Sequence, residues 1–530
     1  MMFRRAWLGL VALLVGVPVI WSAADPAAAV CVPTSAASVP LTDVTAPGFV
    51  PVQPIRLADT RSGIGVEAGA IEAGCVLRVG VAAANPPAGA TAVALTITSD
   101  AATAEGYVTA YACGSSRPET STLNPRPNDP TSNLAVVALD STRQLCFYSE
   151  QPTQLIVDVT GWFTPTGARL HEIVPVRSLD TRVDGTPAAA GEVVRIPLAG
   201  VDVPAEATAV AASVTITQAT GPTYATAYPC GGDVPQTSTV NTLRNRDRGV
   251  PAIVGLGEGA LCLVASASAH LIVDVTGWYG PNSSGSVGSA LEFLATARVA
   301  DTRNGIGTDG AKVRLEAGAT LEIPVLDAAP VGSTAVQINV VAVGATQPGY
   351  LTVFPCLADQ PYTSAVNFRA VTAETAMATV ALGTDGKVCI FTSATTHVIV
   401  DLVASYGTPG SLHALTASPA LDQTYRPGQL DHSLHCPAGG GDITITVDAP
   451  PGVLAAIGAG AAQNGRQTRV VHLDEGDATP ILLSGAVDEH HSLRCLPADF
   501  PQLRASGEAA TPGWYLASFL TSSTTPTPTS

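Results

Sequence analysis

Three hexamers rich in arginine and aspartate carry the residue types and spacing best suited to chemistry in this chain. RLADTR begins at Arg56, RSLDTR at Arg177 and RVADTR at Arg298, so that successive copies start 121 residues apart. Carboxylate and guanidinium groups at such spacing suit an ion pair, or a site for a ligand or cation. A second aspartate recurs inside an apolar run of each copy, at Asp158, Asp274 and Asp401.

The first interpretation of the hexamer is an ion pair that joins the first strand of a repeat to its last. A carboxylate in an apolar strand must be paired, because an unpaired buried charge is very costly. The arginine that ends each hexamer can bind a carboxylate through two hydrogen bonds. We therefore expect structural ion pairs of Arg61 with Asp158, Arg182 with Asp274 and Arg303 with Asp401, beside the hexamer carboxylates Asp59, Asp180 and Asp301. The alternatives are a ligand or cation site and an exposed pair without consequence.

The ten cysteines show no C-x-x-C metal pattern and favour disulfides. Three pairs recur at matching places with separations of 33, 32 and 33 residues, which predicts one disulfide in each repeat. Closing a loop of that length stabilises by about 3–4 kcal/mol in the chain-entropy model. The expected pairs are Cys113–Cys146, Cys230–Cys262 and Cys356–Cys389, then Cys436–Cys495 in the last domain and Cys31–Cys75 at the mature N-terminus.

Histidine and tryptophan offer further candidate sites, each with a plainer alternative. His432, His435, His490 and His491 would form a metal site if their strands met, although surface histidines on a β-domain are commoner. Trp162 and Trp278 share a strand-end position, where packing is favoured over a carbohydrate platform. A further repeat position holds a replaceable polar residue, which is Gln154, His270 or His397.

The elements that must position these residues are β-strands. Val93, Leu95 and Ile97 alternate with small residues, which is the period of a half-buried strand. The same landmarks return three times in one order: AVALTIT-like, GYVTAYAC-like and TSTLN-like segments, then LIVDVTGWF, LIVDVTGWY or VIVDLVASY. Each copy holds about seven or eight strands, which is enough for one β-sandwich and too long for a single propeller blade.

The expected architecture is therefore all-β. Arg4, Arg5 and the apolar run after them predict a secretory signal peptide, with a retained membrane anchor as the alternative. An Ig-like or cadherin-like sandwich should follow the three sandwich repeats, because alternating strands such as DITITVDAP lie there. The predicted boundaries are 1–29 for the signal, 30–165, 166–281 and 290–407 for the repeats, 411–520 for the last domain and 521–530 for a Thr/Pro-rich tail.

Two resemblances extend this interpretation. The R-x-x-D-T-R start and V-D-V-T-G-W finish over residues 51–407 resemble tandem β-rich modules of exported actinobacterial proteins, a resemblance that implies export but little function. RCLPADFP from Arg494 and GWYL from Gly513 resemble the entry region of secreted arylsulfotransferase-like proteins, where a cadherin-like domain leads into a catalytic propeller. The chain ends soon after this match, so no catalytic residue carries over.

Charge and composition limit the function further. The net charge of −17 without a basic stripe argues against nucleic acid and anionic membranes as partners. No catalytic residue, metal site or cofactor is assigned, and the binding residues stay unknown. We expect a secreted, non-catalytic spacer, adhesion or binding module at the cell surface, whose partner is a cell-wall glycan or another surface protein. The alternative is the accessory part of an arylsulfotransferase-like enzyme.

Overall fold

The computed structural model describes residues 47–282, 288–325, 328–329, 333–383 and 385–407, and between 415 and 520 the backbone of short strands. Among the described residues up to position 407, antiparallel sheets make up almost all regular structure, apart from a single 3-10 turn, η1 (Ala82–Ala84). No helix among the described residues is long and apolar enough to cross a membrane. The predicted signal peptide and the Thr/Pro-rich tail lie outside the described residues.

The first repeat supplies a four-stranded inner sheet and a three-stranded outer sheet. The inner order is β1 (Gly48–Asp59), β7 (Gln154–Thr164), β3 (Ala92–Asp100) and β5 (Thr131–Ala138). The outer order is β2 (Cys75–Gly80), β6 (Gln144–Ser149) and β4 (Val108–Ala112). The strand expected at AVALTIT is therefore β3, and LIVDVTGWF forms β7.

The second and third repeats copy this plan with four strands in each sheet. In the second, the inner order is β13 (Arg248–Gly255), β10 (Ala209–Thr217), β15 (His270–Gly280) and β8 (Arg169–Asp180), and the outer order is β12 (Val240–Thr242), β11 (Thr223–Pro229), β14 (Ala260–Ala265) and β9 (Val193–Pro197). In the third, the inner order is β16 (Ala290–Asp301), β23 (His397–Gly407), β18 (Ser333–Val343) and β21 (Glu374–Ala381), and the outer order is β17 (Thr320–Pro324), β22 (Lys387–Thr392), β19 (Gly349–Pro355) and β20 (Val366–Phe368).

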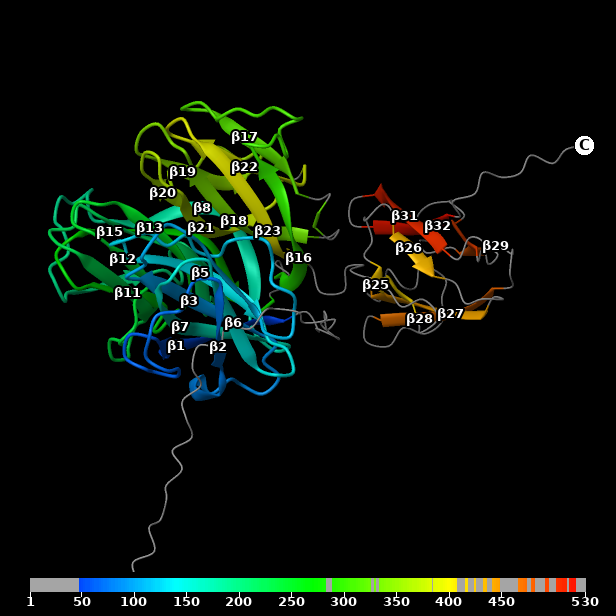
Figure 1. Ribbon diagram of the computed structural model, residues 1–530, viewed down its shortest axis with the longest axis horizontal. Helices are drawn as coiled ribbons and strands as arrows, with labels where there is room; N and C mark the ends of the chain where they lie inside the picture. Colours follow the sequence, from blue (N-terminus) through cyan, green and yellow to red (C-terminus); the bar gives the residue numbers. More distant parts are fainter. Residues whose placement is uncertain are drawn as a thin grey trace, which may run out of the picture.

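These six sheets are arranged as a six-bladed β-propeller in which each repeat supplies two blades (Figure 1). The prediction of three tandem β-sandwiches plus a fourth Ig-like one is therefore wrong, although the all-β class is confirmed. A repeat of 121 residues is too long for one blade, but it is long enough for two. The inner sheets of the three repeats also share a central apolar cluster.

Burial on both faces of the inner sheets explains the sequence pattern. Val93, Leu95 and Ile97 face a cluster within the first repeat, between its two sheets. The intervening Ala92 and Ala94 face the central cluster, together with their counterparts from the other repeats. The expected half-buried strand is thus buried on both sides, and small residues on its second face let the three repeats approach closely.

Aromatic residues from the ends of the closing strands fill this central cluster. Phe163 and Tyr279 lie at equivalent positions of β7 and β15, and Phe49 of β1 packs between them at ring-centroid distances of 5.3 and 5.1 Å. The hydroxyl groups of Tyr279 and Tyr406 are 3.0 Å apart and hydrogen-bonded. The predicted packing role of Trp162 and Trp278 is confirmed, since 0% and 5% of their surfaces are exposed.

Three of the predicted disulfides are confirmed, and each crosslinks strands of an outer sheet or their ends. They are Cys113–Cys146, Cys230–Cys262 and Cys356–Cys389. Cys75 is disulfide-bonded as well. Its predicted partner, Cys31, lies outside the described residues, as do Cys436 and Cys495.

Between positions 415 and 520 the described backbone forms smaller sheets. One has the order β25 (Thr424–Tyr425), β24 (Leu415–Ala417), β27 (Gly441–Asp448) and β28 (Arg466–Leu473). The others join β26 (His432–His435), β31 (Gln502–Thr511) and β32 (Trp514–Leu520), and β29 (Ala478–Ile481) with β30 (His491–Arg494). The side chains of the four candidate metal-site histidines, and the whole RCLPADFP segment beyond Arg494, are outside the described part.

Candidate functional site

The recurring aspartate of each closing strand is paired with the first arginine of the hexamer. Arg56 and Asp158 are direct cross-strand neighbours of β1 and β7. The guanidinium group donates from Nε at 2.6 Å and from Nη2 at 3.2 Å to the two carboxylate oxygens. The second and third repeats repeat this bidentate pair at 2.8 and 3.1 Å, between Arg177 and Asp274 and between Arg298 and Asp401. At most 1% of each of these aspartates is exposed.

The predicted pairs of Arg61, Arg182 and Arg303 with these aspartates are therefore wrong. β1 ends at Asp59, so Arg61 lies in the turn that follows and cannot face β7. Its guanidinium group instead donates to Asp59, at 3.0 Å from Nε and 2.8 Å from Nη2. Arg182 binds Asp180, and Arg303 binds Asp301, in the same way. The hexamer thus takes part in three ion pairs: one across the sheet, one within its own turn, and a third between its first arginine and its own aspartate, at 3.1 Å for Arg56 and Asp59.

The threonine of the hexamer, which lies between the aspartate and the last arginine, explains why one repeat position can hold either glutamine or histidine. The Thr60 hydroxyl is 2.5 Å from Gln154 Oε1 and accepts a hydrogen bond from the backbone N–H of Leu155. In the other repeats the threonine contacts Nδ1 of His270 at 3.0 Å and of His397 at 2.9 Å. Glutamine and histidine both offer a partner to the hydroxyl group here, so the position tolerates exchange.

The same aspartates also join neighbouring repeats. Asp158 accepts a hydrogen bond at 3.1 Å from the backbone N–H of Ser238 in the second repeat. Asp274 accepts the equivalent bond, also at 3.1 Å, from Ser364 in the third. Burial raises the pKa of both carboxyls, while the paired arginines and these N–H groups oppose that shift. Closure from the third repeat to the first uses other residues, with Asn339 donating to the Ser121 carbonyl.

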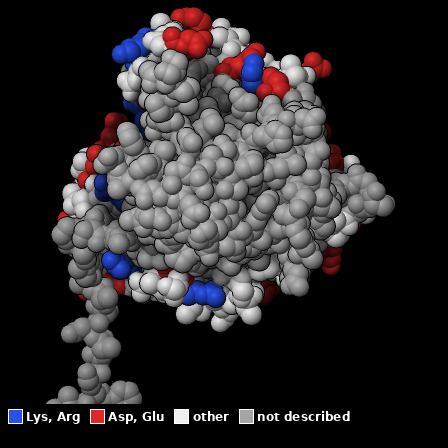
Figure 2. Space-filling model, turned by 90° about the vertical axis from the view of Figure 1, so that its right-hand side faces the viewer, with Lys and Arg blue, Asp and Glu red and all other residues white. Residues whose placement is uncertain are grey.

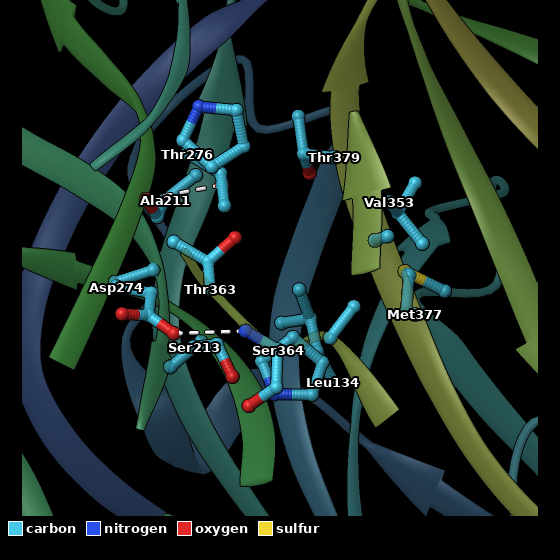
Figure 3. Close-up of a pocket in the computed structure, with 16 residues that line it drawn as sticks. Leu134, Ala211, Ser213, Asp274, Thr276, Val353, Thr363, Ser364, Met377 and Thr379 are labelled. Carbon is cyan, nitrogen blue, oxygen red and sulfur yellow. Dashed lines mark hydrogen bonds between the residues drawn. The ribbon is translucent and has the colours of Figure 1, made fainter. Parts of the chain in front are cut away.

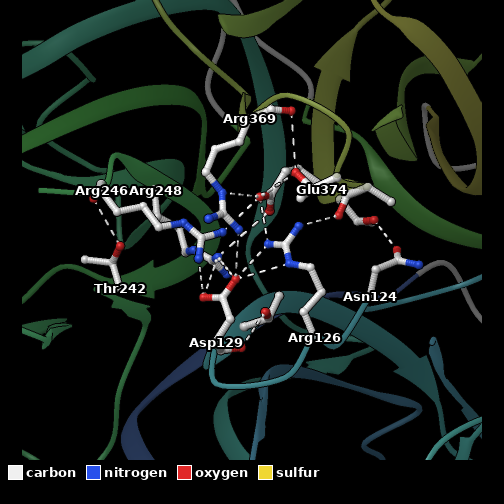
Figure 4. Close-up of polar contacts among 12 residues, drawn as sticks. Asn124, Arg126, Asp129, Thr242, Arg246, Arg248, Arg369 and Glu374 are labelled. Carbon is white, nitrogen blue, oxygen red and sulfur yellow. Dashed lines mark hydrogen bonds and ion pairs between the residues drawn. The ribbon is translucent and has the colours of Figure 1, made fainter. Parts of the chain in front are cut away.

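A second, larger charged cluster lies where loops of all three repeats meet (Figure 4). We call it the central charge cluster. Each repeat contributes two side chains just before or at the start of β5, β13 or β21. Its members are Arg126 and Asp129, Arg246 and Arg248, and Arg369 and Glu374. All are at most 8% exposed in their side chains except Arg369, at 43%.

Contacts in the central charge cluster cross every repeat boundary. The Asp129 carboxylate pairs with three guanidinium groups, at N–O distances of 2.9 Å to Arg126, 3.1 Å to Arg248 and 3.3 Å to Arg369. The Glu374 carboxylate pairs with Arg126 at an N–O distance of 2.7 Å and with Arg246 at 2.9 Å. Burial favours a raised pKa for Asp129, but the surrounding arginines outweigh it and lower the pKa. Burial lowers the pKa of Arg248 to about 10.

Two hollows lie at the repeat junctions. The first is a small, partly open cavity of about 30 Å³ between the second and third repeats, bordered by Asp274, Ser364 and Met377 (Figure 3). It has room for a water molecule or two and not for an organic ligand. The second is an open groove of about 610 Å³ between residues 53–56 and residues 232–237. Gln53 crosses this groove and donates to the Asp233 carbonyl at 2.7 Å.

Sequence reasoning missed the central charge cluster. Asn124, Asn241 and Asn367 occupy the same place in the three repeats, at the end of the TSTLN-like segment. The residue seven positions later is Thr131, Arg248 or Glu374, respectively. The three copies therefore carry different residues at one position, and repetition could not reveal them. The density of arginines in LRNRDR, from Leu243, was the one available signal. Among the described residues, no group of three or more His, Cys, Asp or Glu side chains could hold a metal ion.

Comparisons with known proteins add little to this picture. No family model matches the chain, and no curated protein matches it. Among solved structures, the N-terminal CBM22-1-CBM22-2 tandem domain of Xyn10C from Paenibacillus barcinonensis is similar over 42% of this chain and 84% of its own. The sequence identity is 15% and the TM-score is 0.13, so this similarity carries no argument.

Proposed function

We propose that this protein is an exported, non-catalytic module that acts at the cell surface as a spacer or binding unit. The observation that carries the proposal is the use of the repeated charged motif. In all three copies both arginines of the hexamer pair with aspartates of the same repeat, one in the closing strand and one in the hexamer itself. A motif whose charged groups pair in this way in every copy supports a role in folding. The three disulfides are compatible with an oxidising, extracellular setting.

The open groove between the first two repeats is the binding surface that we favour, and a cell-wall glycan is its proposed partner. Gln53 borders it on one side, and Asp233 and Gln236 border it on the other. These amide and carboxylate groups are suited to the hydroxyl groups of a sugar chain. Exposed Val234 adds an apolar surface against which a sugar ring can pack.

A binding screen of the mature chain against glycans and peptidoglycan tests the proposal. A Gln53→Ala/Gln236→Ala variant should lose binding and keep its melting temperature, because both side chains lie at the rim of the groove. Gln360→Ala is the matched control, since Gln360 is an exposed residue of the corresponding loop in the third repeat. Retention of a surface protein but no glycan would overturn the choice of partner. Transfer of a sulfuryl group from an aryl sulfate to a phenol would overturn the non-catalytic assignment.

A further inference from the structure

The central charge cluster carries more positive than negative charge. Four guanidinium groups face two carboxylates among the described residues, which leaves an excess of two positive charges. Burying like charges without compensation is costly, so such a cluster attracts negative charge. On the described surface in Figure 2, by contrast, acidic and basic side chains lie close together around the periphery, so that neither sign of charge dominates there.

One of these guanidinium groups, that of Arg369, retains a donor without a hydrogen-bond acceptor. Arg246 is 7% exposed, and its Nη1 lies in close ionic contact with the Asp129 carboxylate, which satisfies that donor. Arg369 Nε is buried, makes no hydrogen bond and lies 3.7 Å from Glu374 Oε1. A buried N–H group without an acceptor costs about 1–3 kcal/mol or more. Arg369 would therefore gain from an additional oxygen acceptor.

The three loops that form the cluster have one backbone conformation and different side chains. Asn128, Asn245 and Val371 occupy the same place in each loop, with φ of 57°, 52° and 59°. The residue that directly follows each of these is charged in two copies only. It is Asp129 in the first loop and Arg246 in the second, but Thr372 in the third. A third acid at Thr372 would have reduced the excess charge, and the chain does not supply it.

We propose that the central charge cluster binds a divalent oxyanion, phosphate or sulfate, at Arg369. A tetrahedral dianion matches the excess of two charges and offers oxygen atoms to several guanidinium donors at once. Arg369 gives the ion a route from solvent, because 43% of its side chain is exposed. The bound ion neutralises the excess positive charge where the three loops meet and so stabilises the closed ring. This proposal stands independently of the glycan groove.

Titration calorimetry and thermal unfolding of the mature chain test the proposal. Sodium sulfate and sodium phosphate are compared with sodium chloride and acetate at equal ionic strength. Sulfate, phosphate or both should bind with one site per chain and raise the melting temperature as their concentration rises. The monovalent salts should not reproduce the rise. Comparing the two dianions identifies which one the site prefers.

Arg369→Gln is the informative loss variant, because its partly exposed side chain can be replaced without opening the core. It should weaken dianion binding by about tenfold or more, since a hydrogen bond to a charged group is worth about that much. Arg244→Gln is the matched control: Arg244 is exposed on the same loop as Arg246 and lies outside the cluster. It should bind like the unaltered protein.

Thr372→Asp tests the charge argument without removing any arginine. The new carboxylate should supply the missing negative charge, raise the melting temperature in dilute chloride and abolish the response to sulfate and phosphate. Dianion binding unchanged in both Arg369→Gln and Thr372→Asp would overturn the proposal. Equal stabilisation by chloride at matched ionic strength would overturn it as well, because it would show general screening.

Discussion

The hexamer pairs and the central charge cluster are both built from arginine and carboxylate, yet they repeat differently. Arg56, Arg177 and Arg298 each bind the aspartate opposite them with nearly one geometry. The central charge cluster draws on the same loop of each repeat, but Arg248 lies where the third repeat has Glu374. One kind of contact is copied with the repeat, and the other exists only once.

This difference separates two structural tasks. The hexamer pairs join strands inside a repeat, a requirement that every copy shares. The central charge cluster joins three loops at one place, where identical residues would put like charges together. Ring closure therefore requires the copies to differ, because attraction between loops needs both signs. The three loops thus differ in their charged residues because together they join the three repeats.

Arg177→Ala should have the largest effect of the changes that probe this comparison. It leaves Asp274 buried and unpaired, which costs about 3–5 kcal/mol of unfolding free energy. Because the repeats share the central apolar cluster, the loss should appear in one cooperative transition, measured by denaturant unfolding. Arg182→Ala is the matched control, since it breaks only the pair within the turn and should cost about 1 kcal/mol or less. The reverse ranking would restore the pairing predicted from sequence.

Removing one disulfide should rank next and should be equal in the three repeats. Cys230→Ala/Cys262→Ala opens a loop of 32 residues, and the other two pairs span 33. Loop-closure entropy gives about 3–4 kcal/mol for each. Denaturant unfolding of the three double variants measures this. A large difference between copies would contradict the view that the disulfides, like the hexamer pairs, serve each repeat separately.

Glu374→Gln should show that the central charge cluster depends on its few acids. The amide leaves Arg126 and Arg246 without a charged partner at that position, which should cost about 2–3 kcal/mol. Arg369→Gln is the comparison in the same loop. It should change stability by about 1 kcal/mol or less, because its side chain is partly exposed. Equal losses from both variants, measured in dilute chloride, would contradict an excess of positive charge.

Periodicity and repetition predicted the strands well but not their arrangement. Val93, Leu95 and Ile97 marked β3 because they alternate, yet Ala92 and Ala94 gave no sign of burial on their own. Alanine is small enough to be either exposed or packed, so the second buried face was missed. Without it, each repeat seemed complete as one sandwich. The contact that overturns this lies between repeats whose hexamers start 121 residues apart, beyond the range of any local pattern.

The candidate site shows a similar limit. The need for a partner was predictable for Asp158, since a carboxylate in an apolar strand cannot stay unpaired. The choice between Arg56 and Arg61 depended on where β1 ends and on a register shift between Arg56 and Ala58. The end of a strand is set by the geometry of the turn that follows it. Here the Asp59 carboxylate accepts a hydrogen bond from the backbone N–H of Arg61 in that turn. The sequence contained both arginines in one hexamer and no signal to separate them.

The pH dependence of stability should give the smallest effect, and it separates the turn pairs from the strand pairs. Burial opposes ionisation of Asp59 and Asp301, but their arginines lower the pKa, and Arg182 lowers that of Asp180. These carboxyls contribute stability above their unfolded pKa of about 3.9 that is lost as pH falls through the lower folded pKa. The raised pKa of Asp158 and Asp274 acts oppositely, so protonation of these two favours the folded state.

Denaturant unfolding measured from pH 7 to 2.5 tests the contribution of the turn pair. The Asp180→Asn variant should lose less unfolding free energy over this range than the unaltered protein, by about 1 kcal/mol or less. Asp184→Asn, at an exposed position nearby, should follow the unaltered profile, and a flatter profile in that variant instead would contradict the assignment to the turn pair.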